Sequence, residues 1–319
     1  MKPVPYMGGA IPVQPLPRRQ GGFLYPETAD TLWVNSGRAA FECILRSLSA
    51  MPQRVWVPRF VCDTLSEPLA RLHIPVARYA VDAQFRPVLP ADAAPQDVLV
   101  LVNYFGLTGE AVAAAAAAAP CPVVVDATTA LYTPPLPGVP TFYSPRKFAG
   151  LADGGVAVGV RALPVDLPVD AESDTRTAAL MERHDAAAVQ AAEDALSSTP
   201  KRMGQLTREL LVNTPWQAAA EQRLRNYAVL HRALGPINRL QLPQVPAHAP
   251  MCYPLVCGIP GMRDAWIDAG VRLPLYWPEV IESTDAADTE NRLARTLLPL
   301  PLDQRYTEAD MQRLVELVL

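Results

Sequence analysis

The chain alternates short apolar runs with stretches in which apolar residues recur at helical spacing. Residues 36–50 predict a helix, because Ala40, Ile44 and Leu48 lie on one face and Ser36 can cap its start. Further helices are expected at about 65–72 and over the alanine run at 109–119. β-type apolar runs predict strands within residues 54–58, 76–82, 97–106 and 122–127.

The runs within 97–106 and 122–127 are apolar at nearly every position, so both faces of these strands are expected to be covered. Strands covered on both faces and alternating with helices are typical of a parallel or mostly parallel sheet. The pattern therefore predicts the α/β fold class.

The second half of the chain has a different texture. Residues 162–200 are mixed and acidic, 200–234 predict one or two long helices, and 242–250 form a proline-rich connection. The segments that follow, at 251–258, 262–271 and 308–319, predict a small terminal α/β unit. We therefore expect an irregular N-terminal arm (1–21), a large α/β domain that includes the long helices (22–241) and a small C-terminal α/β domain (242–319).

Composition narrows the possible partners. A net charge of −4 without a sustained basic block argues against nucleic acid or an anionic membrane surface, but leaves a small anionic ligand possible. The five cysteines are odd in number and form no C-x-x-C pair, so neither a disulfide framework nor a zinc site is indicated. Reduced thiols fit a cytoplasmic protein. Prolines and glycines interrupt the first 20 residues, which predicts neither a signal peptide nor a membrane span.

Ligands of open α/β sheets collect at the carboxyl ends of the strands, so polar residues just past each apolar run are candidates for chemistry. Ser36 and Gly37 open the first predicted helix, where free amides and the helix dipole can hold a phosphate; a plain helix cap is the alternative. The run ending at residue 106 brings Asn103, Tyr104 and Phe105 to the same edge. An aromatic residue there can flank a cofactor or simply fill the core.

Two further candidates carry charge. Asp126 ends the run PVVVD, and a carboxylate at the mouth of a buried strand needs a partner such as a protonated pyridine nitrogen; a helix cap is again the alternative. Lys147, in SPRK, is one of three lysines in a chain with 25 arginines. An amine can form an imine with an aldehyde and a guanidinium cannot, and the adjacent Arg146 favours a lowered lysine pKa. The scarcity of lysine makes a plain surface charge a less natural explanation of Lys147, and a salt bridge remains the alternative.

Taken in chain order, a phosphate turn, an aromatic residue, an acid and an imine-forming lysine indicate a pyridoxal 5′-phosphate (PLP) site. The segments SGRAAF, VVVDATTA and SPRKFAGLADGGVAVG resemble the DegT/DnrJ/EryC1/StrS family of fold-type I PLP-dependent sugar aminotransferases. The resemblance extends from about Gly22 onward and points to a compact branch encoded among bacterial surface-polysaccharide genes. It implies a mostly parallel sheet in a large domain and a smaller C-terminal α/β domain.

The resemblance also implies roles for individual residues. Lys147 is expected to form the Schiff base and Asp126 to pair with the pyridine nitrogen. The phosphate is expected to face Ser36, Gly37 and Arg38, and also Ser144 by a looser S-x-x-K analogy. Arg202 matches a family arginine that reaches the neighbouring subunit's site, which implies a homodimer.

The sequence also departs from the family pattern. Arg38 stands where the family has Thr, and Thr129 where it has Gln or His. The aromatic residue that stacks on the cofactor ring falls near Cys62, which leaves Phe60 or Tyr104 as substitutes. The resemblance implies a cytoplasmic enzyme that passes nitrogen from an amino donor to a keto-sugar, with a nucleotide-linked sugar expected. A degenerate binding or regulatory protein, or a PLP enzyme of another reaction type such as dehydration, remains the alternative.

Overall fold

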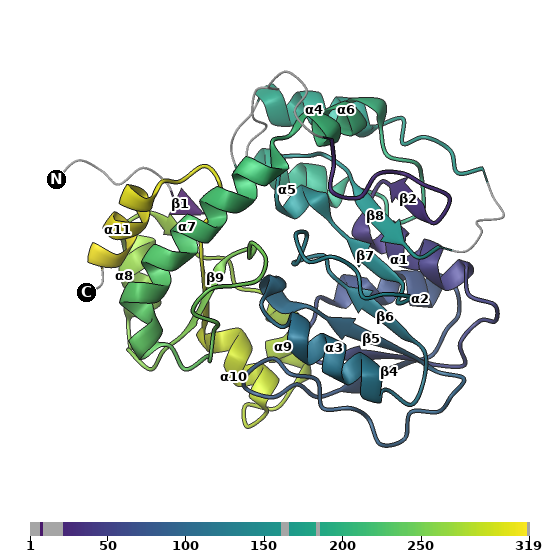
Figure 1. The fold of residues 1–319 in the computed structure, drawn as a ribbon, viewed down its shortest axis with the longest axis horizontal. Coiled ribbons are helices and arrows are strands. Elements are labelled where there is room, and N and C mark those ends of the chain that lie inside the picture. Colours follow the sequence, from purple (N-terminus) through teal and green to yellow (C-terminus); the bar gives the residue numbers. More distant parts are fainter. Residues whose placement is uncertain (1–6, 9–21, 161–165, 183–185, 318–319) are drawn as a thin grey trace.

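A seven-stranded sheet forms the centre of the computed structural model, which describes residues 7–8, 22–160, 166–182 and 186–317 (Figure 1). Its strands are β2 (Thr31–Val34), β3 (Val55–Pro58), β4 (Val76–Tyr79), β5 (Val98–Val102), β6 (Val123–Asp126), β7 (Thr141–Tyr143) and β8 (Gly155–Val158). They lie in the order β2-β8-β7-β6-β5-β3-β4. The predicted α/β class is confirmed.

One strand runs against the others. The pairs from β7 through β6, β5 and β3 to β4 are parallel, whereas β8 is antiparallel to both β7 and β2. The start of β8 therefore lies at the edge of the sheet where the other strands end. Gly155, the first residue of β8, and the preceding Gly154 share this edge with Asp126 and with the turn after β7.

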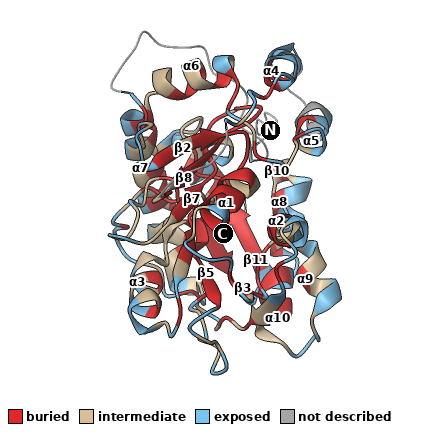
Figure 2. Ribbon diagram, turned by 90° about the vertical axis from the view of Figure 1, so that its right-hand side faces the viewer, coloured by how far each residue is buried: buried red, intermediate tan, exposed pale blue. Residues whose placement is uncertain are grey.

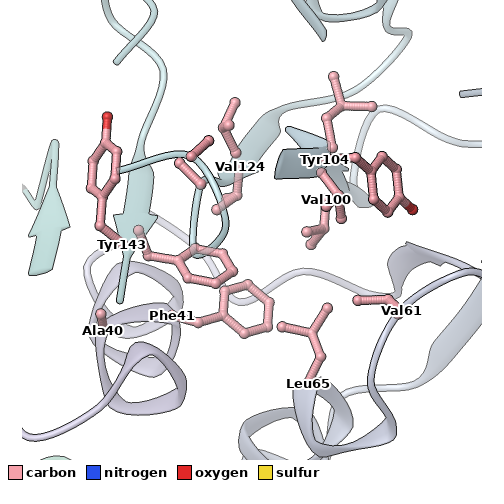
Figure 3. Close-up of a cluster of buried hydrophobic side chains, with 14 of the residues drawn as sticks. Ala40, Phe41, Val61, Leu65, Val100, Tyr104, Val124 and Tyr143 are labelled. Carbon is pink, nitrogen blue, oxygen red and sulfur yellow. The ribbon is translucent and has the colours of Figure 1, made fainter. Parts of the chain in front are cut away.

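Helices cover both faces of the sheet, and β5 is therefore buried at every position. Helix α1 (Gly37–Arg46) packs on β7 and β8, and α3 (Gly109–Ala118) packs on β5. Phe41 of α1 stacks on Phe142 of β7 with ring centroids 5.0 Å apart, and Val100 and Val124 project from the sheet into the same cluster (Figure 3). The sheet is the buried centre of the molecule in Figure 2.

Ser36 caps α1 as the sequence predicts. Its backbone is extended, with φ −154°, and its hydroxyl accepts a hydrogen bond from the amide of Ala39 at 3.1 Å. Gly37, the first residue of α1, has no side chain that could cover the amides of the first turn. The cap therefore places the start of α1 at the sheet edge with its first amides open.

The remaining helices form the outer layer and the C-terminal part. They are α2 (Glu67–Arg71), α4 (Ser173–Glu182), α5 (Ala186–Asp194), α6 (Gln205–Asn213), α7 (Trp216–Leu234), α8 (Met262–Asp268), α9 (Pro278–Ser283), α10 (Thr289–Thr296) and α11 (Glu308–Glu316). The predicted long helices over 200–234 are α6 and α7. Within the described ranges, no helix is long and apolar enough to cross a membrane.

A second, smaller core lies in the C-terminal part. Strand β9 (Tyr253–Val256) pairs antiparallel with β11 (Leu297–Leu300), and α8, α11 and the second half of α7 pack around them. The first half of α7 belongs to the main core through Trp216, so α7 joins the two cores (Figure 1). The proposed division at residue 241 stays a prediction. The expected N-terminal arm lies outside the described residues except β1 (Met7–Gly8), which pairs parallel with β10 (Val271–Arg272).

Candidate active site

Lys147 and Asp126 come together at the carboxyl edge of the sheet. Asp126 is the last residue of β6 and is buried, and its carboxylate accepts a hydrogen bond from the amide of Thr128 at 2.8 Å. Lys147 ends a 3₁₀ turn, Pro145–Lys147, that follows β7, and its ammonium donates to the hydroxyl of Thr128 at 3.1 Å. Thr128 therefore contacts both charged residues.

The surroundings shift the pKa values of both groups toward their neutral forms. Burial raises the pKa of Asp126, and the nearby charge of Lys147 and the Thr128 amide only partly oppose it. Desolvation of the amine by the surrounding protein lowers the pKa of Lys147, although its side chain is accessible to solvent. Asp126 and Cys62 oppose this shift, and Arg146 adds to it. Lys147 is thereby more nucleophilic near neutral pH than an ordinary lysine.

The start of α1 lies beside this pair. A Cβ atom on Gly37 would lie 3.1 Å from a side-chain carbon of Thr128 and 3.5 Å from one of Ser144, so glycine leaves a small space between them. Within the described chain, the amides of Gly37 and Arg38 and the hydroxyl of Ser144 have no hydrogen-bond partner. Free donors around a small space at a helix start can bind an anion.

Two arginines near this space are already paired with glutamates. Arg38 forms a two-bond contact with Glu67 at 2.8 and 2.9 Å, so its side chain turns from the open amides toward α2. Arg146 forms a similar contact with Glu193 of α5, at 2.6 and 2.8 Å. Burial opposes the charge of Glu193, but Arg146 outweighs it and the pKa of Glu193 is lowered. The sequence analysis missed Glu193, since no sequence pattern links it to a residue 47 positions away.

The aromatic candidates lie in the core. Tyr104 is 2% exposed, donates its hydroxyl to the carbonyl of Phe60 at 2.6 Å and packs against Phe85 with ring centroids 5.2 Å apart. Phe60 is fully buried and packs nearly perpendicular to the ring of Trp277, with ring centroids 4.7 Å apart. Neither ring presents an open face for a ligand in this structure, so both residues support the sheet edge from within.

The sequence analysis singled out Thr129, whereas in the structure its neighbour Thr128 is the residue that lies in the site. The hydroxyl of Thr129 donates to the carbonyl of Asn103 at 3.0 Å and accepts from the amide of Phe105 at 3.1 Å, which ties the end of β5 to the end of β6. Thr128 instead contacts Lys147 and Asp126. Thr128 lies two residues after Asp126, in the loop that follows β6. That position is the sequence signal that could have identified it.

The backbone of Arg202 lies beside the end of β2, where it bridges to Val34. Its backbone bonds to Pro168 and Asp170, and its half-exposed side chain lies 3.9 Å from Glu27. Among the described residues, no hydrogen bond or ion pair joins Arg202 to the Asp126–Lys147 pair of its own chain.

Solved structures with similar folds cover most of the chain. The sugar aminotransferase CalS13 from Micromonospora echinospora shares 18% identity with a TM-score of 0.65, covering 91% of this chain and 86% of that chain. A DegT DnrJ EryC1 StrS aminotransferase from Brucella abortus shares 16% identity with a TM-score of 0.62, covering 90% and 84%. The putative sugar aminotransferase Spr1654 from Streptococcus pneumoniae, in its PMP-form, shares 14% identity with a TM-score of 0.63, covering 98% and 96%. The chain has the sugar aminotransferase fold.

This likeness confirms the fold predicted from the resemblance. No protein-family model matches the chain, and no curated protein sequence matches it either. The likeness thus lies in the fold and in a few short motifs, and a fold alone does not fix the reaction.

The residues present fit PLP within the sugar aminotransferase fold. The open amides of Gly37 and Arg38 and the hydroxyl of Ser144 suit a phosphate, and the buried Asp126 has no cation within ion-pair distance among the described residues, which suits a pyridinium. Lys147 supplies an amine between them. Among the described residues, no group of three or more His, Cys, Asp or Glu side chains can hold a metal ion.

Proposed function

We propose that the chain is a PLP-dependent aminotransferase that transfers an amino group from an amino donor such as glutamate to a keto-sugar. The observation that supports this most directly is the contact of Thr128 with both Asp126 and Lys147, beside the open amides of Gly37 and Arg38. The sugar class is proposed by extension from the structural neighbours, whose names describe sugar aminotransferases.

PLP, when bound, supplies an aldehyde and an electron-withdrawing ring. Lys147 would supply the amine that holds the aldehyde end of PLP, and the same amine, once free, would serve as general base for a proton of the substrate. Asp126 would hold the ring nitrogen of PLP, and its negative charge would favour the protonated form of that nitrogen. Gly37, Arg38 and Ser144 hold the phosphate through backbone amides and a hydroxyl.

The proposal includes a nucleotide-linked sugar, a role in bacterial surface polysaccharide synthesis, a homodimer and a cytoplasmic location. The half-exposed side chain of Arg202 supports the dimer, because it is available to a second subunit. The five cysteines are all free, which supports a reducing compartment.

Borohydride trapping tests the proposal. We expect the protein mixed with PLP to develop a near-visible absorbance band, and borohydride to fix the cofactor on the peptide that contains Lys147. Mass spectrometry of the digest identifies the peptide, with the Lys147→Arg variant as the control that keeps the charge and loses the amine. Attachment at Lys201, or no band with excess PLP, would contradict the proposed site.

A panel of amino donors separates an enzyme from a binding protein. An aminotransferase should lose the band as the donor's nitrogen passes to the cofactor, and should regain it when a keto-sugar is added. Trapping at Lys147 without conversion by any donor in the panel would favour the binding or regulatory alternative.

A further inference from the structure

Phe148, the residue directly after Lys147, is held from the C-terminal part of the chain. The side chain of Gln304 donates from Nε2 to the carbonyl of Phe148 at 2.9 Å, and its Oε1 accepts from Nε of Arg223 at 3.0 Å. The guanidinium of Arg223 also lies over the ring of Phe148, with Cζ 4.9 Å from the centroid. One arginine–glutamine pair therefore fixes Phe148 through both its carbonyl and its ring.

Arg223 is an unfavourable residue for this position on stability grounds alone. It is fully buried, and no carboxylate of the described chain lies within ion-pair distance. Its Nη1 donates to the carbonyls of Pro250 and Met251 at 3.2 and 2.9 Å, and its Nη2 has no hydrogen-bond partner. A buried cation whose only hydrogen-bond acceptors are uncharged oxygens costs free energy of folding that an apolar side chain of similar size would not.

Arg223 lies at the point of α7 where the two hydrophobic cores meet, which gives this unfavourable residue a role. Trp216, near the start of α7, packs in the main core, whereas Tyr227 and Leu230 pack in the second core. Arg223 lies between them, where the helix passes from one core to the other. A shift of the second core relative to the sheet would therefore move Phe148, and with it the adjacent Lys147.

We infer that Arg223 and Gln304 are positioning residues for Lys147. They act through Phe148 and set where the amine lies relative to Asp126 and Thr128. This inference rests on the proposed function, and it adds that the reactivity of the amine depends on how the second core is docked.

Two substitutions of Gln304, which is only partly buried, test the inference without removing Arg223. Gln304→Glu keeps an acceptor for Arg223 and supplies a counter-charge, but loses the donor to Phe148. Gln304→Met loses both contacts. The two variants should therefore move stability in opposite directions, since only the first neutralises Arg223. Arg225→Gln is the matched control, because Arg225 lies on the same helix in an exposed ion pair with Glu308 at 3.1 Å.

We expect the rate at which PLP forms the near-visible band to fall about tenfold to a hundredfold in both Gln304 variants, since a misplacement of this kind acts on geometry rather than on stability. The Arg225→Gln control should keep the unmodified rate. Rates that follow the melting temperature, or that stay near the unmodified value in both variants, would overturn the inference.

A second readout does not require the cofactor. Acetic anhydride labels neutral amines, so the pH at which the Lys147 peptide is half-labelled, with the Lys201 peptide as internal reference, reports the surroundings of Lys147. We expect this midpoint to differ from the unmodified protein in both Gln304 variants. If the unmodified protein forms no band with PLP but the midpoint still depends on Gln304, the proposed function fails and the positioning stands; an unchanged midpoint in both variants overturns the positioning itself.

Discussion

Two buried aspartates lie at the same edge of the sheet and use their oxygens differently. Asp153, just before β8, accepts the hydroxyl of Ser173 at 2.8 Å, the amide of Gly204 at 2.9 Å and the hydroxyl of Thr207. Asp126, at the end of β6, accepts one backbone amide. Both are nearly inaccessible to solvent, and burial raises the pKa of both.

The difference distinguishes a structural acid from one prepared for a ligand. Buried polar groups are normally satisfied, and Asp153 meets this rule by joining β8 to α4 and α6. Asp126 meets it only in part and faces a lysine instead. Position at a strand end is therefore a poor guide to function on its own, and the number of donors around a buried carboxylate is a better one.

Among substitutions at these two aspartates, Asp126→Asn should have the largest effect on function. The amide keeps the shape of the carboxylate but cannot hold a proton on a pyridine nitrogen by its charge. We expect the variant still to be trapped on Lys147 by borohydride, with weaker retention of PLP. Conversion by an amino donor should fall more than about a hundredfold, the scale of one positioned acid–base contribution. A variant that converts donors at the unmodified rate would show that Asp126 is no more functional than Asp153.

Alanine substitutions at the two positions should differ in stability. Asp153→Ala leaves three donors without an acceptor in a buried place, so we expect it to lower the free energy of unfolding by about 3 kcal/mol. Asp126→Ala removes the acceptor of one amide and should cost about 1 kcal/mol. Denaturant titration of the cofactor-free variants measures both values. Equal losses would mean that the donors counted around each carboxylate do not decide its role.

The smallest expected effect concerns Thr128. Because the pKa of Lys147 is lowered, its neutral fraction, and with it the rate of PLP attachment, should rise with pH and reach half its maximum below the ordinary lysine value of about 10.4. Thr128→Val keeps the shape and removes the oxygen that accepts from the ammonium. The charged form loses that support, so the midpoint should move down by about half a unit to one unit. Stopped-flow absorbance across pH tests this, and a midpoint that moves up would reverse the assigned role of Thr128.

The fold was predictable where the apolar pattern was long. Strands β3, β4, β5 and β6 all lie inside the runs expected to form strands, and valine and leucine fill both faces of the longest of them, β5. The pattern did not predict β7, which has only three residues, or β2, whose four residues lie directly between Asp30 and Asn35. Strand β8 lies in the segment SPRKFAGLADGGVAVG, which was singled out by the resemblance to a family and not by an apolar pattern.

The candidate site divides in the same way. Lys147 and Asp126 could be singled out because one is a rare residue type and the other ends a buried strand. Glu193, Asp153 and the Arg223–Gln304 pair could not, because each makes its contacts with residues 20 or more positions away along the chain. Such contacts depend on how separate helices dock, and no local pattern encodes that.

The course of α7 through both cores bears on how the chain can be dissected. A fragment that ends near residue 241, at the proposed start of the C-terminal domain, would keep all of α7 but lose the strands and helices that cover Tyr227, Leu230 and Leu234. Half of a 19-residue helix would then present an apolar face to water. The two parts are therefore bound into one cooperative folding unit, and the chain should unfold in a single transition although it has two hydrophobic cores.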